Sequence, residues 1–210
     1  MSAKGLPGAL PAGERLLWQG SPDWRALARR TFHGRALSIY FAALLAWVVA
    51  SRLYDGAATR DLAAAVMWFG GLALGGLGLV TLFAWLTART TTYTITDRRL
   101  VMSYGIALTM SINLPFAKVA TAAMRLFPDG TADIPLVMAP GEKIAFAMLW
   151  PHARPWRMAR PEPALRAVPD GAEVAGVLAR ALAAAHSQPI PATARRIEST
   201  VPAGSVAAAA

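Results

Sequence analysis

The side chains that could support catalysis or metal binding are few in this chain, and they form no recognisable motif. The histidines stand at positions 33, 152 and 186, and none belongs to an HExxH pattern or a comparable metal-binding spacing. There is no cysteine, which excludes thiolate nucleophiles and cysteine metal sites. The carboxylates of the central region all lie at predicted turns or edges: Asp97, Asp129, Asp133 and Glu142. We therefore expect no catalytic residues and no metal site, and a protein that is not an enzyme.

His33 is the one histidine for which a specific ligand can be named. It stands a few residues before a long apolar segment, and a histidine beside a membrane span can coordinate the magnesium of a tetrapyrrole. A solvated histidine, or one that faces lipid head groups, is the ordinary interpretation and the one that we favour. His33 is thus a speculative pigment ligand.

A basic helix is predicted for residues 21–35, with Ser21 as the N-cap and Pro22 at the first helical position. Its apolar residues recur at helical spacing and its arginines lie off that stripe. We expect the helix to lie in the cytoplasmic membrane interface and to lead into the apolar segment that follows. A helix that packs on a soluble domain is the alternative. The residues assigned to this interfacial site are Trp24, Arg25, Arg29 and Arg30.

A second basic and aromatic group occupies the loop between residues 150 and 163. Four prolines exclude a regular element there. Arginines interleaved with tryptophans are suited to contact with an anionic lipid or with the cytoplasmic face of a protein partner. The residues assigned to this loop site are Trp150, Arg154, Trp156, Arg157 and Arg160.

Residues 36–88 lie between the basic helix and the later loop in the chain. They hold two long apolar segments joined by a short polar turn. The segments 36–53 and 62–87 would be roughly 27 and 39 Å long as helices. A bilayer's hydrocarbon core is about 30 Å thick, so both can cross it as an antiparallel hairpin. Arginines cluster before the first segment and after the second, while the turn holds Asp55 and Asp61. The positive-inside rule therefore predicts an inner-membrane protein with both termini in the cytoplasm.

Three glycines of the second segment share one helix face. Gly71, Gly75 and Gly78 fall at i, i+4 and i+7, which lets another helix approach closely. Packing inside the hairpin is the interpretation that we favour over packing against a partner helix.

After the hairpin the apolar residues change from helical to alternating spacing. Residues 90–150 predict about six short strands, and the run that ends at Trp150 has the cleanest alternation. Residues 100–116 lack charge, but their two-residue period and polar content argue against a third span. An amphipathic helix over 174–185 is suited to closing a small β domain. The expected fold is α+β, divided into an N-terminal segment (1–20), an interfacial helix (21–35), a hairpin (36–88), a β domain (89–186) and a disordered tail (187–210).

Composition sets further bounds on function. The 210 residues carry a formal net charge of +9, enough chain for a hairpin and one small domain. Arginine far outnumbers lysine and alanine is abundant, which indicates GC-rich coding more than a nucleic-acid surface. Residues 1–20 lack the charged-then-apolar pattern of a cleavable signal peptide.

Two sets of motifs carry a family resemblance. One set resembles the strand-turn-strand core of bacterial pleckstrin-homology-like (PH-like) domains that follow transmembrane hairpins. This set consists of YTITDRRLVM, GIAL and INLPF. A more specific resemblance is to the PuhB type of photosynthetic-complex assembly protein of purple bacteria. It rests on three stretches: GERLLWQGSPDWRALARRTFH, DGTADIPL and LWPHARPWRMARPEPALRAVPD. Such proteins have been drawn with three spans, whereas this sequence predicts two.

The resemblance implies a non-catalytic scaffold that helps to assemble the reaction centre with light-harvesting complex 1. Its implied partners are subunits of those complexes. The arginines near the membrane make anionic lipid a further expected partner, a second copy of the chain is another, and the composition argues against nucleic acid. Two alternatives remain open: a membrane-anchored lipid-binding module, and a carrier that hands bacteriochlorophyll to apoproteins. Only the carrier would hold a cofactor.

Overall fold

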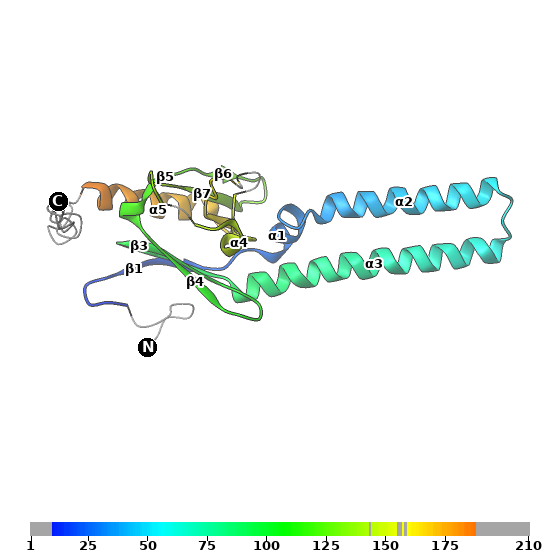
Figure 1. The fold of residues 1–210 in the computed structure, drawn as a ribbon, viewed down its shortest axis with the longest axis horizontal. Helices are drawn as coiled ribbons and strands as arrows, with labels where there is room; N and C mark the ends of the chain where they lie inside the picture. Colours follow the sequence, from blue (N-terminus) through cyan, green and yellow to red (C-terminus); the bar gives the residue numbers. More distant parts are fainter. Residues whose placement is uncertain (1–9, 143, 155–156, 158, 188–210) are drawn as a thin grey trace, which may run out of the picture.

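A long helical hairpin projects from one end of a small β domain in the computed structural model (Figure 1). The structure describes residues 10–142, 144–154, 157 and 159–187. The predicted tail at 187–210 lies outside the described residues from position 188 onward, and so does Trp156.

The hairpin consists of α2 (Gly34–Tyr54) and α3 (Thr59–Thr90), which pack side by side. Both are long and apolar enough to cross a membrane, and neither buries any residue of its most apolar 18-residue window. They are the two such helices in the part of the chain that the structure describes. Residues 100–116 form strands instead, so the prediction against a third span is confirmed.

The first sheet is antiparallel, in the order β1-β2-β3-β4, and the hairpin is inserted between its first two strands. Because β1 pairs with β2 from Trp18↔Ile95 to Gly20↔Tyr93, the chain returns to the same sheet after both helices. The predicted boundary at residue 20 is therefore wrong, since the end of the supposed N-terminal segment is part of the β domain. The strands are β1 (Leu16–Gly20), β2 (Thr92–Thr96), β3 (Arg99–Tyr104) and β4 (Met110–Pro115).

The second sheet is built around β7, and the short helix η1 (Phe116–Lys118) connects the two sheets. β5 and β6 pair with successive halves of β7, and β8 also pairs with β7. The strands are β5 (Val119–Ala122), β6 (Arg125–Leu126), β7 (Ala132–Met138) and β8 (Ala164–Val168). The sequence missed β8 because all five of its residues are buried, which leaves no polar–apolar alternation.

The C-terminal helix α5 (Gly171–Ser187) packs on the β domain as predicted. Val174, Leu178 and Leu182 are buried in one core with the apolar residues of both sheets. Where α5 begins, Gly171 lies so close to Ala132 of β7 that a Cβ there would be 2.6 Å from the Ala132 backbone nitrogen. The contact between helix and sheet therefore requires glycine at this position.

The strand predicted to end at Trp150 is wrong. Residues Phe146–Leu149 form the one-turn helix α4, and the Trp150 N–H closes that turn by donating to the oxygen of its first residue, Phe146. The alternation placed Met148 and Trp150 on a buried face, whereas the structure buries Leu149 and leaves Trp150 59% exposed. β5 and β6 pair with β7 along one edge and β8 pairs with it along the other. Residues 144–150 therefore cannot form a further strand beside β7.

Candidate functional site

The helix α1 (Trp24–Arg30) fixes the junction between the hairpin and the β domain. Asp23 is its N-cap, accepting from the Ala26 N–H at 2.6 Å, so the prediction that Ser21 caps this helix is wrong. The Asp23 N–H donates to the Ala167 oxygen at 2.8 Å, and Leu27 is fully buried beside Ala167. α1 also packs against α3 and α2. It therefore packs on both the β domain and the base of the hairpin, and its place in the membrane interface stays a prediction.

The arginines at the end of α1 are directed toward a turn of the second sheet. Asp129 lies 2.9 Å from Arg29 and 3.2 Å from Arg30, and its Oδ1 accepts from the Thr131 hydroxyl at 2.6 Å. Hydrogen bonds from Thr131 and from Arg30 lower the pKa of Asp129 to about 2, against an opposing effect of burial. The Arg30 guanidinium also stacks 3.8 Å from the Phe127 ring. These contacts fix Arg30 against the domain.

Arg166 of β8 joins four parts of the molecule. It is 5% exposed, and its Nε lies 3.3 Å from Asp133 Oδ2 on β7. One Nη donates to the Ala153 oxygen at 3.3 Å, and the other donates to the Thr31 hydroxyl at 3.1 Å. Arg166 therefore connects the end of α1, the loop after α4 and the paired strands β7 and β8.

A buried histidine holds the loop after α4 against the base of the hairpin. His152 is fully buried, with Nδ1 2.7 Å from the Tyr93 hydroxyl and Nε2 3.2 Å from the Thr91 hydroxyl. Because the Arg166 N–H donates to the Tyr93 oxygen, the Tyr93 hydroxyl is free to donate to Nδ1, which leaves Nε2 to donate to Thr91. Burial, helped by the nearby Arg166 charge, lowers the pKa of His152 to about 3. The ring is thus neutral and structural.

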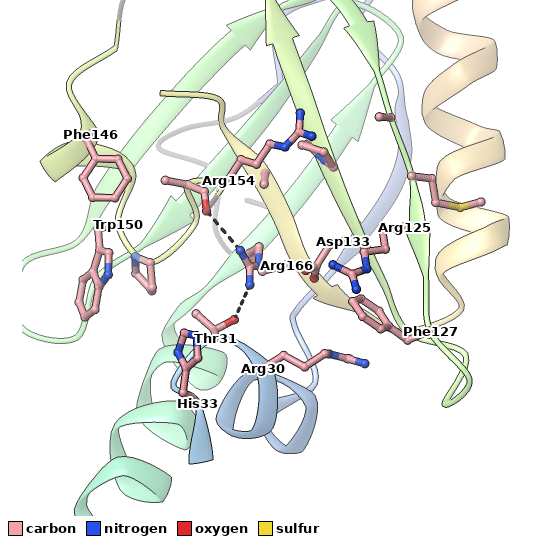
Figure 2. Close-up of a pocket in the computed structure, with 16 residues that line it drawn as sticks. Arg30, Thr31, His33, Arg125, Phe127, Asp133, Phe146, Trp150, Arg154 and Arg166 are labelled. Atoms are coloured by element: carbon pink, nitrogen blue, oxygen red, sulfur yellow. Dashed lines mark hydrogen bonds and ion pairs between the residues drawn. The ribbon is translucent and has the colours of Figure 1, made fainter. Parts of the chain in front are cut away.

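These contacts surround a cavity of about 600 Å³, here called the junction pocket. Figure 2 shows Phe146 and Trp150 along one side, Arg125 and Phe127 on the opposite side, and Arg166 between them. Thr31 and His33, at the start of the hairpin, line its lower edge in this view. The lining is Arg30, Thr31, His33, Ala123, Met124, Arg125, Phe127, Asp133, Pro135, Phe146, Trp150, Pro151, Ala153, Arg154, Ala164 and Arg166.

The lining of the junction pocket carries more positive than negative charge. Its lining includes four arginines, at positions 30, 125, 154 and 166, against the single carboxylate of Asp133. Guanidinium groups are planar donors that pair well with phosphate or carboxylate oxygens. Within the described residues no group of three histidines and carboxylates could hold a metal ion. The pocket is therefore suited to an anion with an apolar part beside it.

The structure brings together four of the residues assigned from sequence. Arg30 and His33 come from the α1–α2 connection, Trp150 and Arg154 come from the later loop, and all four line the junction pocket. His33 itself is exposed and adopts a left-handed backbone conformation with φ of 55° at the start of α2. Its role as a pigment ligand stays a prediction.

The other assigned residues lie outside the pocket. On α1, Arg25 stacks 5.3 Å from the Trp24 ring, and Arg29 is exposed. In the loop, Arg157 lies 3.6 Å from Glu162, and Arg160 is exposed. Their proposed contacts with lipid or partner stay predictions.

The glycine face of α3 is open, which overturns the preference for packing inside the hairpin. A Cβ built at Gly71, Gly75 or Gly78 would meet nothing within 4 Å. It is Gly76 that faces α2, where a Cβ would lie 3.5 Å from the Phe41 ring. The i, i+4, i+7 spacing identified a shared face correctly but could not show which side of α3 the first helix occupies.

Sequence reasoning missed the pocket residues that the second sheet supplies. Arg125, Asp133 and Arg166 are brought together by the pairing of β7 with β6 and β8. A charged residue within the apolar run ALRAV was the available signal, because a buried arginine requires a partner.

Comparison with known proteins gives the class. The family described as "Bacterial PH domain" matches residues 40–182, so the chain belongs to the bacterial PH domain family. A Rhodobacter capsulatus protein, described as an uncharacterized 23.7 kDa protein in the puhA 5' region, is 34% identical over 186 residues. The match covers 88% of this chain and 87% of that relative. Both findings support the resemblance to PuhB-type proteins. No solved structure matches the chain.

Proposed function

We propose that this protein is a membrane-anchored, non-catalytic assembly factor for the reaction centre and light-harvesting complex 1 of purple bacteria. The observation that carries the proposal is an unburied apolar hairpin inserted into a bacterial PH domain, in a chain whose relative is named for the puhA region. The motif resemblance supplies the link to photosynthetic assembly. The proposed location is the inner membrane, with both termini and the β domain in the cytoplasm.

The charge distribution along the hairpin supports this orientation. Arg29, Arg30 and Arg35 lie near the start of α2, and Arg89 near the end of α3, all at the domain end of the hairpin. The tip carries acidic residues at positions 55 and 61, besides two arginines. A cytoplasmic domain end agrees with the excess of positive charge there.

The open face of α3 is the proposed contact for partner helices. Gly71, Gly75 and Gly78 form an exposed strip without side chains. In lipid, helices associate through close backbone approach, and small residues permit that approach. A single-span subunit, or a second copy of this chain, could pack on the strip while α2 occupies the other side.

Affinity purification from phototrophically grown cells tests the assembly role. Tagged full-length protein should recover reaction-centre or light-harvesting 1 subunits, identified by a subunit list and an absorption spectrum. Gly71→Leu/Gly75→Leu should reduce that recovery severalfold, because two isobutyl groups would hold a partner helix away. Gly70→Leu is the matched control, since a Cβ there also meets nothing but Gly70 lies off the strip.

Two results would contradict the proposal. Recovery of pigment without photosynthetic subunits would indicate the bacteriochlorophyll carrier instead. Unchanged recovery with Gly71→Leu/Gly75→Leu would remove the glycine face from the interface.

A further inference from the structure

We propose that the junction pocket binds the phosphate group of an anionic membrane phospholipid. The inference depends on the membrane position of the hairpin given under the proposed function, and it names a ligand for the base of that hairpin. The argument uses the free charge in the pocket, the place where the pocket lies and the apolar residues at its opening.

The pocket contains positive charge that the described residues do not neutralise. Arg166 is paired with Asp133, and Arg154 with Glu162 at 2.8 Å. Arg125 has no carboxylate within ion-pair distance in the described part of the chain, and its guanidinium lies 5.2 Å from the Phe127 ring. Arg30 is paired with Asp129 at 3.2 Å, but its Nε is buried and finds no hydrogen-bond acceptor among those residues. An anion would supply the missing charge and acceptors.

The pocket lies at the depth where a head group would be found. Thr31 and His33 line it, and α2 begins at the very next residue, Gly34. If α2 enters the hydrocarbon region within its first turns, its start lies among the phosphates of the cytoplasmic leaflet. Arginines near an anionic leaflet each gain about 1 kcal/mol from its surface potential. A lipid phosphate can therefore reach the pocket without leaving the bilayer surface.

Apolar side chains at the same end of the domain suit lipid contact. Trp150 lines the pocket and is 59% exposed. Its ring packs on the Phe32 ring in a T-shaped arrangement, with 6.1 Å between the two ring centroids. Tryptophan prefers the membrane interface, where its ring is partly apolar and partly hydrated. Met148, two residues before Trp150 in the chain, is 44% exposed. An acyl chain leaving the pocket past Trp150 would cover part of this apolar surface.

A second apolar group lies on the other side of the base of α3. The pair Thr92↔Ser103 places the end of β3 beside the start of β2, which follows α3 after one residue. The turn after β3 therefore lies at the hairpin end of the domain, as Figure 1 shows. That turn exposes Ile106 and Leu108. Apolar groups on both sides of α3 favour a lipid surface over a soluble acidic peptide as the source of the anion.

Native mass spectrometry of the full-length protein in a neutral detergent tests this inference. The probes are phosphatidylglycerol and phosphatidylcholine, which share a phosphodiester but differ in net charge. Wild type should retain one phosphatidylglycerol and bind phosphatidylcholine more weakly. Arg125→Gln should weaken phosphatidylglycerol binding about tenfold, which corresponds to about 1.4 kcal/mol and to one charge-assisted hydrogen bond. Arg125→Lys keeps the charge and should lose less.

Arg180→Gln provides the matched control, because Arg180 is an exposed arginine of α5 that does not line the pocket. It should leave phosphatidylglycerol binding unchanged. Ala123→Glu, at an exposed lining position, is a second variant that adds repulsion and should also weaken binding. Far-UV circular dichroism of each variant checks that the β domain is folded.

The outcomes separate the sources of the anion. Loss of the lipid on addition of millimolar inorganic phosphate, with phosphate bound in its place, would indicate a free-anion site and overturn the lipid assignment. Equal phosphatidylglycerol binding by Arg125→Gln and Arg180→Gln would show that the lipid binds around the hairpin and not in the junction pocket. That result would also overturn the lipid assignment of the pocket. Unchanged lipid binding by Arg125→Gln, together with reduced subunit recovery by the same variant in the separate affinity purification, would make the pocket a protein contact and overturn the lipid assignment. Since no photosynthetic subunit enters the lipid measurement, this inference and the assembly role can fail separately.

Discussion

Removing the negative charge opposite Arg166 should destabilise the β domain strongly. Asp133→Asn keeps the size of the side chain and an oxygen that can accept the Ala167 N–H, which Asp133 Oδ1 now accepts at 2.8 Å. It removes the carboxylate that lies 3.3 Å from the Arg166 Nε. The remaining acceptors of that guanidinium, the Ala153 carbonyl and the Thr31 hydroxyl, are neutral.

The magnitude follows from burial. Arg166 is only 5% exposed and the Asp133 side chain 18% exposed, so water can replace the lost partner only in part. Removing one member of a buried ion pair costs about 3–5 kcal/mol, and the retained amide oxygen places this variant near the lower end. Domains are stable by about 5–15 kcal/mol, so the loss is a large fraction of the total. With a urea slope of about 2 kcal/mol per molar, the midpoint should fall by about 1.5 M.

Urea denaturation of full-length protein in detergent, followed by far-UV circular dichroism, measures this change. Asp170→Asn is the control, because Asp170 is exposed at a φ of 49° that asparagine accepts readily. Arg166→Met combined with Asp133→Asn removes both charges and should be more stable than Asp133→Asn alone by at least about 1 kcal/mol. A loss under 1 kcal/mol, or a double variant no more stable than Asp133→Asn, would refute the assignment of a buried charge pair.

Two other predictions concern the same domain. The pKa of His152 is about 3 in the folded protein and 6.5 ordinarily, so below pH 6.5 the unfolded chain binds a proton that the folded chain does not. The contribution of neutral His152 to the free energy of unfolding is therefore fully present above pH 6.5 and decreases as the pH falls. The free energy of unfolding should be about 2 kcal/mol lower at pH 5 than at pH 8, and His152→Gln should flatten that slope; an unchanged slope would contradict it. Gly171→Ala should lower the free energy of unfolding, measured by urea denaturation, by about 1–3 kcal/mol, since its Cβ would strike Ala132. Gly176→Ala, inside the same helix with room for a Cβ, should raise it by about 0.5–1 kcal/mol, and equal shifts would argue against the contact.

The elements with strong local patterns were predictable from the sequence. The hairpin is predicted by two long apolar segments, and α5 by apolar residues at helical spacing. The predicted bounds of these helices lie within a few residues of the bounds in the structure. The first sheet follows from alternation in β2, β3 and β4. Local pattern fails where tertiary pairing decides. The run before Trp150 alternates but forms α4, and β8 does not alternate but is a fully buried strand paired with β7.

The candidate site was predictable only in part, for the same reason. Arg30 and Trp150 were singled out by local composition, and both line the junction pocket. Arg125, Asp133 and Arg166 meet there through strand register and burial, which no sequence window contains. The direction of the glycine face likewise depends on where α2 packs.

The most direct measurement of the central claim is the sidedness of the hairpin. The chain has no cysteine, so single substitutions can be labelled on a clean background. Ala58→Cys places a thiol at the exposed tip of the hairpin, and Ala172→Cys places one on the exposed surface of α5. An impermeant maleimide applied to intact spheroplasts should label Ala58→Cys at once and Ala172→Cys only after lysis. Labelling of both positions from the same side, or recovery of the full-length protein in the soluble fraction without detergent, would contradict a hairpin that crosses the membrane.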